Sequence, residues 1–147
     1  MILDLRAIRR TGKDCQDFFF EYNLDENLSD IPHVEVDKVV KVEGTISLTG
    51  NHQAYVEGQV NFTLCGECTK CLKQTQRQFS VDFAEDLCEN NLDGYSVVND
   101  RVDLTKIVKD AILINMPVTL LCSDDCKGIC FGCGVNLNDE QCKCKNK

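Results

Sequence analysis

Residues 34–64 read VEVDKVVKVEGTISLTGNHQAYVEGQVNFTL, and their apolar side chains fall mostly on even positions, with polar and charged side chains between them. Alternation with a period of two is typical of a β-strand that buries one face. The pattern is interrupted at Thr49-Gly50-Asn51-His52, and a Gly-Asn pair between two alternating runs indicates a hairpin turn. We therefore expect a long antiparallel hairpin with one buried face.

The same alternation extends outward from this hairpin. A third strand is predicted by apolar residues at every second position, namely Phe79, Val81, Phe83 and, less regularly, Leu87. Residues 2–5 and the apolar run at residues 18–20 are candidate edge strands. Residues 88–100 are polar and rich in turn-forming residues, so they predict a loop.

After residue 103 the period changes to that of a helix. Apolar residues recur at intervals of three and four, at Leu104, Ile107, Val108, Ala111 and Ile112. Asp103 is a suitable N-cap and Pro117 ends the pattern, so we expect a helix over residues 103–116 that packs on the open face of the sheet.

The expected fold class is α+β. It consists of a curved antiparallel sheet that could close like a barrel, covered by this one main helix. A C-terminal cysteine-rich tail follows, and its six cysteines between residues 122 and 144 predict that it binds zinc. We expect residues 1–121 to form the sheet and helix core and residues 122–147 to form the tail, within one structural unit.

The composition is that of a globular protein of about one domain. Of the 147 residues, 43% are hydrophobic and 27% are charged, which excludes a largely disordered chain. No apolar run approaches the roughly 20 residues of a membrane-spanning helix. The first ten residues lack the apolar stretch of a secretory signal, so we expect a cytoplasmic protein.

The formal net charge is −8, whereas a protein that attracts nucleic acid with its whole surface is basic. Any contact with RNA must therefore come from local basic groups. Three groups are candidates: Arg6, Arg9, Arg10 and Lys13 near the N-terminus, Lys70, Lys73 and Arg77 around the first cysteines, and Lys127, Lys143, Lys145 and Lys147 in the tail. Each could contact phosphate, or its lysines could offset the negative charge of a zinc–thiolate centre.

Residues that usually carry catalysis are scarce. His33 and His52 are the only histidines, and both fall at turn or strand-edge positions where a solvated side chain is the simpler interpretation. The sequence contains no G-x-S-x-G, no phosphate-binding glycine loop and no H-E-x-x-H. We expect no enzymatic activity, no small-molecule substrate and no membrane partner.

The chain has 11 cysteines, and an odd number in a reducing compartment argues against a disulfide framework. Most lie close together in the sequence. They form the series Cys65, Cys68 and Cys71, and the pairs Cys122 and Cys126, Cys130 and Cys133, and Cys142 and Cys144. Four pairs would supply two zinc ions with four thiolates each, and closed sites of this kind are structural.

The spacing leaves alternatives open. It does not choose which two sulfurs of the first series form a pair, while antiparallel strands on both sides disfavour a redox-active C-x2-C. The tail has few large apolar residues and needs metal or bridges to hold a shape, so disulfides in an oxidising compartment are an alternative. The isolated Cys15 and Cys88 are expected to be buried as small apolar residues.

The chain resembles the YceD family, the large ribosomal RNA subunit accumulation proteins, from residue 2 to Cys144. The matching motifs are CTKCL at residues 68–72, the helix that ends before Pro117, LCSDDCKGICFGCGVNLN at residues 121–138 and CKC at residues 142–144. The tail run is the most specific of these. The resemblance implies a bacterial or organellar factor that large-subunit rRNA needs in order to accumulate, without a defined catalytic step.

The resemblance also implies a partition of the cysteines between two zinc ions. Cys68 and Cys71 match the C-x2-C pair of the family, which leaves Cys65 as an extra cysteine. One centre would then use Cys68, Cys71, Cys122 and Cys126, and the other would use Cys130, Cys133, Cys142 and Cys144.

The leading hypothesis is a non-enzymatic ribosome-biogenesis factor that supports the synthesis, processing or stability of large-subunit (23S) rRNA, with zinc as a structural cofactor. One alternative, favoured by the acidic net charge, is an adaptor that binds ribosome assembly proteins without contacting RNA. The other is a redox- or zinc-responsive regulator that uses Cys65.

Overall fold

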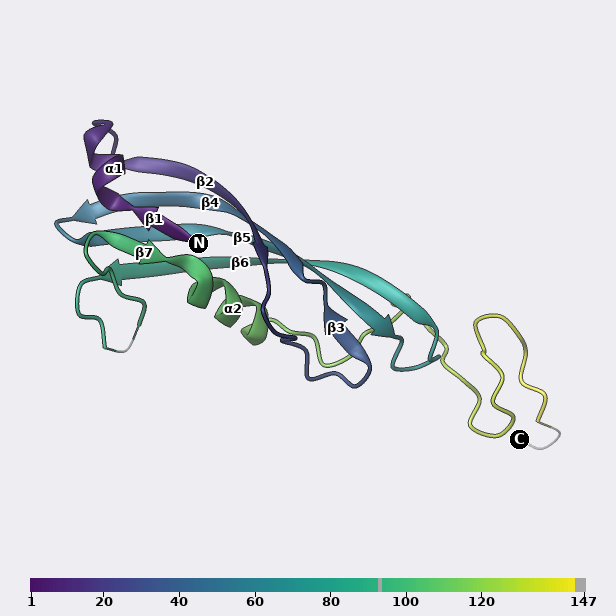
Figure 1. Ribbon diagram of the computed structural model, residues 1–147. Coiled ribbons are helices and arrows are strands. Elements are labelled where there is room, and N and C mark those ends of the chain that lie inside the picture. The colour runs from purple at the N-terminus through teal and green to yellow at the C-terminus, as the bar shows by residue number, and fades with distance from the viewer. Residues whose placement is uncertain (93, 145–147) are drawn as a thin grey trace.

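The computed structural model describes residues 1–92 and 94–144 (Figure 1). The main sheet is antiparallel and contains β2 (Cys15–Asn23), β3 (Val34–Val36), β4 (Val39–Gly50), β5 (Gln53–Glu67) and β6 (Gln74–Cys88). A second, two-stranded sheet contains β1 (Ile2–Asp4) and β7 (Arg101–Asp103). Each of these two short strands leads directly into a helix, β1 into α1 (Leu5–Arg10) and β7 into α2 (Leu104–Ile114). The expected α+β class is confirmed.

The predicted hairpin is the centre of the main sheet. β4 and β5 are antiparallel neighbours joined by a turn at residues 51–52, and β6 pairs with β5 along its whole length. On its other side β5 pairs first with β4 and then with the short β3. Val34 and Val36, which we expected in the first strand of the hairpin, therefore belong to a separate strand.

The sheet does not close into the barrel that the sequence had left open. β2, β3 and β6 each pair with only one strand of the main sheet, and no pairing joins β6 to β2 or to β3 in residues 1–92 and 94–144. Alternation predicts which face of a strand is buried, but it does not predict which edges meet. Here α2 contacts β5, β6 and β1, so the helix and the small sheet cover the face around which a barrel would have closed. The strongly twisted open sheet is visible in Figure 1.

The predicted helix is confirmed, and its apolar stripe forms part of the main core. The side chain of Asp103 caps the helix by accepting a hydrogen bond from the backbone N–H of Thr105 at 2.9 Å. α2 contacts β5 and β6, and its buried face belongs to the same core as the even-numbered side chains of β4 and β5. This core includes Val40, Val42, Ile46, Val56, Val60, Leu64, Leu104, Ile107, Val108 and Ile112.

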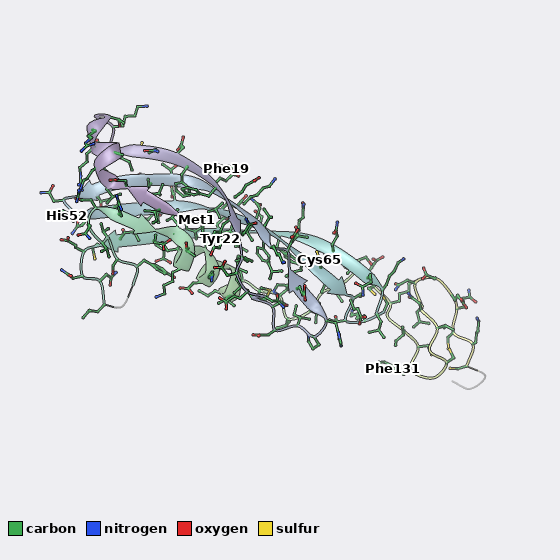
Figure 2. The ribbon with its side chains drawn as sticks, in the orientation of Figure 1. Met1, Phe19, Tyr22, His52, Cys65 and Phe131 are labelled. Carbon is green, nitrogen blue, oxygen red and sulfur yellow. The ribbon has the colours of Figure 1, made fainter. Side chains whose placement is uncertain are left out.

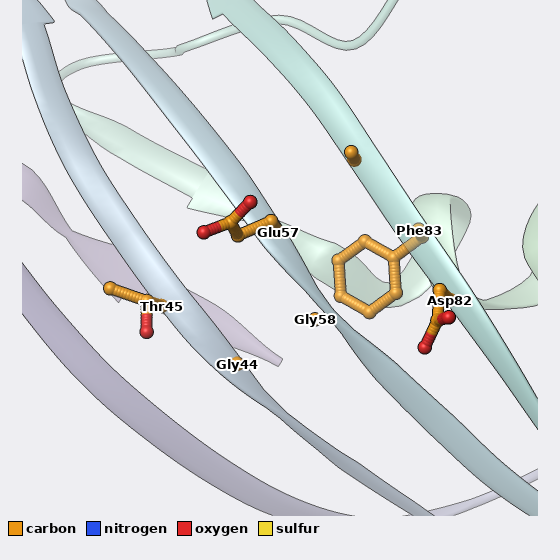
Figure 3. A pocket seen from close by; sticks show the side chains of 7 residues that line it. Gly44, Thr45, Glu57, Gly58, Asp82 and Phe83 are labelled. Atoms are coloured by element: carbon orange, nitrogen blue, oxygen red, sulfur yellow. The ribbon is translucent and has the colours of Figure 1, made fainter.

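Gly44 of β4 and Gly58 of β5 lie opposite each other. A Cβ on Gly44 would lie 2.2 Å from a backbone oxygen of β5, and one on Gly58 would lie 2.9 Å from the tip of the Phe83 ring. Figure 3 shows this ring reaching from β6 toward Gly58. The ring thus occupies the space that a side chain at Gly58 would need.

After α2 the chain runs back along the sheet and ends in the cysteine-rich tail, beyond the far ends of β5 and β6 (Figure 1). α1 and the tail therefore lie at opposite ends of an elongated molecule. None of the helices in the described parts of the chain is long and apolar enough to cross a membrane.

Candidate metal centres

Four cysteines from two distant parts of the sequence meet at the end of the sheet. Cys68 and Cys71 lie in the loop between β5 and β6, whereas Cys122 and Cys126 follow α2. The Sγ atoms of Cys68 and Cys126 are 3.7 Å apart, and those of Cys71 and Cys122 are 3.6 Å apart. Cys68, Cys71 and Cys126 are buried. These four residues are called the first group below.

Backbone hydrogen bonds hold the two halves of the first group together. The backbone N–H of Thr69 donates to the carbonyl oxygen of Leu120 at 2.8 Å, and Leu120 is fully buried in the main core. Within the loop, Leu72 N–H donates to the carbonyl oxygen of Cys68, with Leu72 in the left-handed region at φ 61°. On the tail side, Cys126 N–H donates to Ser123 in a tight turn. The first group thus ties the tail to the sheet.

A second group of four cysteines lies entirely within the tail. It consists of Cys130, Cys133, Cys142 and Cys144. The sulfur of Cys130 lies 3.4 Å from that of Cys142 and 3.7 Å from that of Cys144. Gly134, with φ 74°, donates its N–H to the carbonyl oxygen of Cys130 and closes the turn between the first two cysteines. This group is more exposed than the first.

The distances between the sulfurs fit a tetrahedral metal ion. A Zn–S bond length of about 2.3 Å gives an S–S edge of about 3.8 Å in a regular tetrahedron. Five sulfur pairs within the two groups lie 3.4 to 4.0 Å apart, and all four sulfurs of each group lie within 4.8 Å of one another. A disulfide bond is only about 2.05 Å long, and all 11 cysteines, which fall within the described residues, are free thiols.

The electrostatics of the two groups are also those of a cation site. Burial raises the pKa of Cys68, but hydrogen bonds from the backbone N–H groups of Cys71, Lys70 and Cys122 outweigh it and lower the pKa to about 6. Burial and the neighbouring thiols raise the pKa of Cys71 to about 12. One thiolate forms easily, and its negative charge then keeps the proton on a neighbour. A divalent cation at the centre would stabilise all four thiolates together.

The second group repeats this pattern. Backbone N–H groups of Cys133 and Gly132 lower the pKa of Cys130 to about 6. The thiols of Cys142, Cys130 and Cys133 raise the pKa of Cys144 to about 12. The structure therefore contains two groups of four cysteines positioned to bind a metal ion, composed of the residues that the resemblance assigned to two centres. That the ion is zinc stays a prediction.

The three remaining cysteines belong to neither group. Cys65 lies in β5, and burial together with the carboxylates of Asp37 and Glu35 raises its pKa, which disfavours the thiolate that a redox sensor needs. Cys15 is exposed and Cys88 is half-buried, so the expected burial is wrong for Cys15. The register explains this, because Cys15 is opposite Ser47 on the solvent-facing side of the sheet.

Two of the four basic residues near the N-terminus, Arg6 and Arg9, pair with one carboxylate of the protein. Arg6 Nε donates to Asp100 Oδ2 at 3.0 Å, and Arg9 Nη1 donates to Asp100 Oδ1 at 2.9 Å. Hydrogen bonds from Arg9 and Arg6 lower the pKa of the Asp100 carboxyl to about 2. His52 is not simply a solvated turn residue, because its Nδ1 lies 2.9 Å from Asp100 Oδ1. Arg10 remains exposed, at the end of the molecule opposite the tail (Figure 1).

The basic residues beside the cysteine groups are more accessible. Lys70 and Lys73 are exposed and have no side-chain partner in the described parts of the chain, whereas Arg77 pairs with Asp124 at 2.8 Å. In the tail, Lys127 is exposed and Lys143 forms an ion pair with Glu140. Lys145 and Lys147 lie outside the described residues.

Two residues of the tail stand out that the sequence patterns did not single out. Phe131 lies between Cys130 and Cys133, and its side chain is fully exposed at the surface of the tail (Figure 2). Asn138 donates a hydrogen bond to the sulfur of Cys126 at 3.4 Å. In the sequence, only their position between the paired cysteines of the tail could have indicated a role for these two residues.

Comparison with known proteins points to one family. The family described as "Large ribosomal RNA subunit accumulation protein YceD" matches residues 56–147, which include most of β5, all of β6 and α2, and both cysteine groups. The chain belongs to the YceD family. The family match begins at residue 56. It therefore does not include residues 2–55, over which the sequence also resembled the family.

Individual relatives cover shorter parts. The chain is 37% identical over 44 residues to "Large ribosomal RNA subunit accumulation protein YCED homolog 1, chloroplastic" of Arabidopsis thaliana, a match of 30% of this chain and 14% of that protein. The maize protein of the same name is 28% identical over 67 residues, 45% of this chain and 23% of that protein. An uncharacterised protein of Mycobacterium tuberculosis is 31% identical over 94 residues, 58% of this chain and 45% of that protein. The chain thus spans less than half the length of these curated relatives. No solved structure matches it.

Proposed function

We propose that this protein is a non-enzymatic, cytoplasmic ribosome-biogenesis factor that supports the synthesis, processing or stability of large-subunit (23S) rRNA. Membership of the YceD family carries the proposal, because the family and its plant relatives are named for the accumulation of this RNA. The match includes both groups of cysteines, so the proposal concerns the part of the chain that contains the candidate metal centres.

The proposed metal ions are structural zinc ions. Zinc supplies a fixed tetrahedral link, and four thiolates leave no position open for water or substrate. At the first group the link would join the loop between β5 and β6 to the segment after α2. At the second it would fold a segment that contributes no residue to the main core. Zinc would thus replace the apolar core that the tail lacks.

The end of the molecule that carries the cysteine groups is the proposed RNA contact. Lys70, Lys73 and Lys127 are exposed there and could contact phosphate. Phe131 presents an exposed ring at the surface of the tail, as RNA-binding modules do when they stack on unpaired bases. Arg6 and Arg9, by contrast, are bound to Asp100.

In-cell UV crosslinking tests this proposal. The tagged full chain is crosslinked to RNA, purified under denaturing conditions and its attached RNA is sequenced. We expect a sharp peak on large-subunit rRNA or its precursor. A profile at the level of an untagged control would contradict direct contact with RNA.

One observation favours the adaptor as a second candidate. The solvent-facing side of the sheet has six exposed carboxylates and one exposed lysine, Lys41, on β2, β4, β5 and β6. The carboxylates are those of Asp17, Glu21, Glu43, Glu57, Asp82 and Asp86. Such a surface is complementary to a basic ribosome assembly protein. The adaptor predicts that basic ribosomal proteins are recovered with this protein after RNase treatment and are lost at high salt, with no crosslink to rRNA.

A further inference from the structure

One side chain connects the two groups of cysteines. Asn138 lies in the sequence between Cys133 and Cys142 of the second group. Its Nδ2, however, donates a hydrogen bond to the sulfur of Cys126 in the first group, at 3.4 Å. Cys126 is buried, at 5% exposure, whereas Asn138 is exposed, so the amide approaches the sulfur from the surface of the protein. Such outer contacts orient a ligand atom and tune its affinity for metal.

The surrounding hydrogen bonds fix the orientation of the Asn138 amide. Its Oδ1 accepts a hydrogen bond from the backbone N–H of Lys127 at 2.8 Å, and its Nδ2 also donates to Oδ1 of Asn136 at 2.8 Å. The two N–H bonds and the carbonyl oxygen of the amide are therefore all used. Turning the amide over would place its oxygen against the sulfur and its NH2 against the Lys127 N–H. The donor side must therefore face Cys126.

The position of Asn138 depends in turn on the second group. Cys130 N–H donates to the carbonyl oxygen of Val135 at 2.9 Å, and Leu137 N–H donates to that of Gly128 at 2.9 Å. These bonds form a small hairpin around the turn between Cys130 and Cys133. No residue of this hairpin belongs to the main apolar core. At its base, Ile129 packs against the buried cysteines of the first group and donates its N–H to the carbonyl oxygen of Lys70 at 3.1 Å. The rest of the hairpin is held by its own hydrogen bonds and by whatever holds the four sulfurs of the second group together.

We propose that Asn138 couples the two metal centres. Metal in the second centre fixes the hairpin, the hairpin places the Asn138 amide on Cys126, and the oriented Cys126 sulfur binds metal in the first centre more tightly. Asn138 is thus a positioning residue for the first centre although it lies in the sequence of the second. The inference rests on the proposed metal sites and is independent of any contact with RNA.

Cadmium titration of the full-length protein, followed by cadmium NMR, tests this coupling. Cadmium is a thiolate-preferring probe, and the resonance of the first centre is identified by its loss in Cys68→Ser. The affinity of this centre is measured against a competing chelator in Asn138→Ala, in Cys144→Ser and in the double variant. Asp139→Ala is the matched control, because Asp139 is an exposed neighbour on the same loop with no hydrogen bond to Cys126.

The coupling predicts a specific pattern of affinities. Asn138→Ala should weaken cadmium binding at the first centre about tenfold to a hundredfold, the usual effect of removing an outer partner of a ligand. Cys144→Ser should weaken it by a similar factor, and the double variant should be no weaker than the weaker single variant. Asp139→Ala should bind as the wild type does.

Three results would overturn the proposal. They are an unchanged first-centre affinity in Asn138→Ala, an unchanged affinity in Cys144→Ser, and effects that multiply in the double variant. Asn138→Asp distinguishes loss of this hydrogen bond from general disruption of the tail. It keeps the size of the side chain but places an oxygen against the sulfur. It should weaken cadmium binding at the first centre at least as much as Asn138→Ala does. A wild type that binds no cadmium would overturn the proposed metal sites as well, whereas two bound ions without coupling would overturn this inference alone.

Discussion

Replacing Cys68 by serine should destabilise the whole fold more than replacing Cys130 by serine does. The two groups of cysteines link very different lengths of chain. In the first group Cys71 and Cys122 are 51 positions apart, on either side of β6, β7 and α2. In the second group Cys130 and Cys144 are 14 positions apart, both within the tail. Loss of the first link therefore removes a constraint on the segments that form the main core, whereas loss of the second removes a constraint on the tail alone.

The size of the effect follows from the length of the loop. For a permanent link across 51 positions the chain-entropy relation gives about 4 kcal/mol at 25 °C. In a protein of this length each kcal/mol lowers Tm by about 2–4 °C, so Cys68→Ser should lower it by about 8–16 °C. The main core includes no residue beyond Leu120. Cys130→Ser should therefore act on the core only by weakening metal binding at the first group tenfold to a hundredfold, which costs about 1.4–2.8 kcal/mol, or about 3–11 °C.

Thermal unfolding followed by far-ultraviolet circular dichroism, with zinc in slight excess, measures both effects. A chelator should lower the Tm of the wild type to that of Cys68→Ser and should leave Cys68→Ser itself nearly unchanged. Serine is close to cysteine in size, so the comparison isolates the sulfur. Equal Tm values for the two variants, or a Cys68→Ser protein as stable as the wild type, would refute the reasoning.

Three further changes have defined outcomes. In Gly58→Ala the new Cβ would lie 2.4 Å from a backbone carbonyl oxygen of β4, so the free energy of unfolding in urea should fall by about 1–3 kcal/mol; an unchanged value would contradict the close approach of the strands. The Asp100 carboxyl has a pKa of about 2 in the folded protein, below its usual value of about 4, so its stabilising effect is complete above pH about 4 and is lost as the pH falls toward 2. Asp100→Asn should remove this part of the pH dependence of urea unfolding, and a profile like that of the wild type would contradict it. Lys70→Ala combined with Lys73→Ala should reduce crosslinking to rRNA severalfold, whereas Arg10→Ala should not. A reduction by Arg10→Ala but not by the two lysine substitutions would instead indicate that α1 contacts the RNA.

The main strands and the main helix could be predicted because each depends on local periodicity. The even-numbered apolar residues around the turn at residues 51–52 form β4 and β5, and the stripe from Leu104 to Ile112 forms the buried face of α2. The edges of the sheet could not be predicted in this way. Whether β2 meets β6 depends on what covers the concave face, and that face is occupied by α2 and by the small β1–β7 sheet.

The candidate centres show the same limit. Short spacings indicate which cysteines form pairs, but spacing alone does not say that the loop before β6 meets the segment after α2 across 51 positions. Charge clusters were a poorer guide, because Arg6 and Arg9 are bound to Asp100, more than 90 positions away. The role of Asn138 depends on a contact between two groups that only the folded chain brings together.

Native mass spectrometry of the purified full-length protein tests the central claim most directly, since it counts and identifies the metal ions bound to each intact chain. The account predicts two zinc ions per chain and no mass loss from disulfide formation. A chain that carries no metal, a single ion or disulfide-linked cysteines would contradict it.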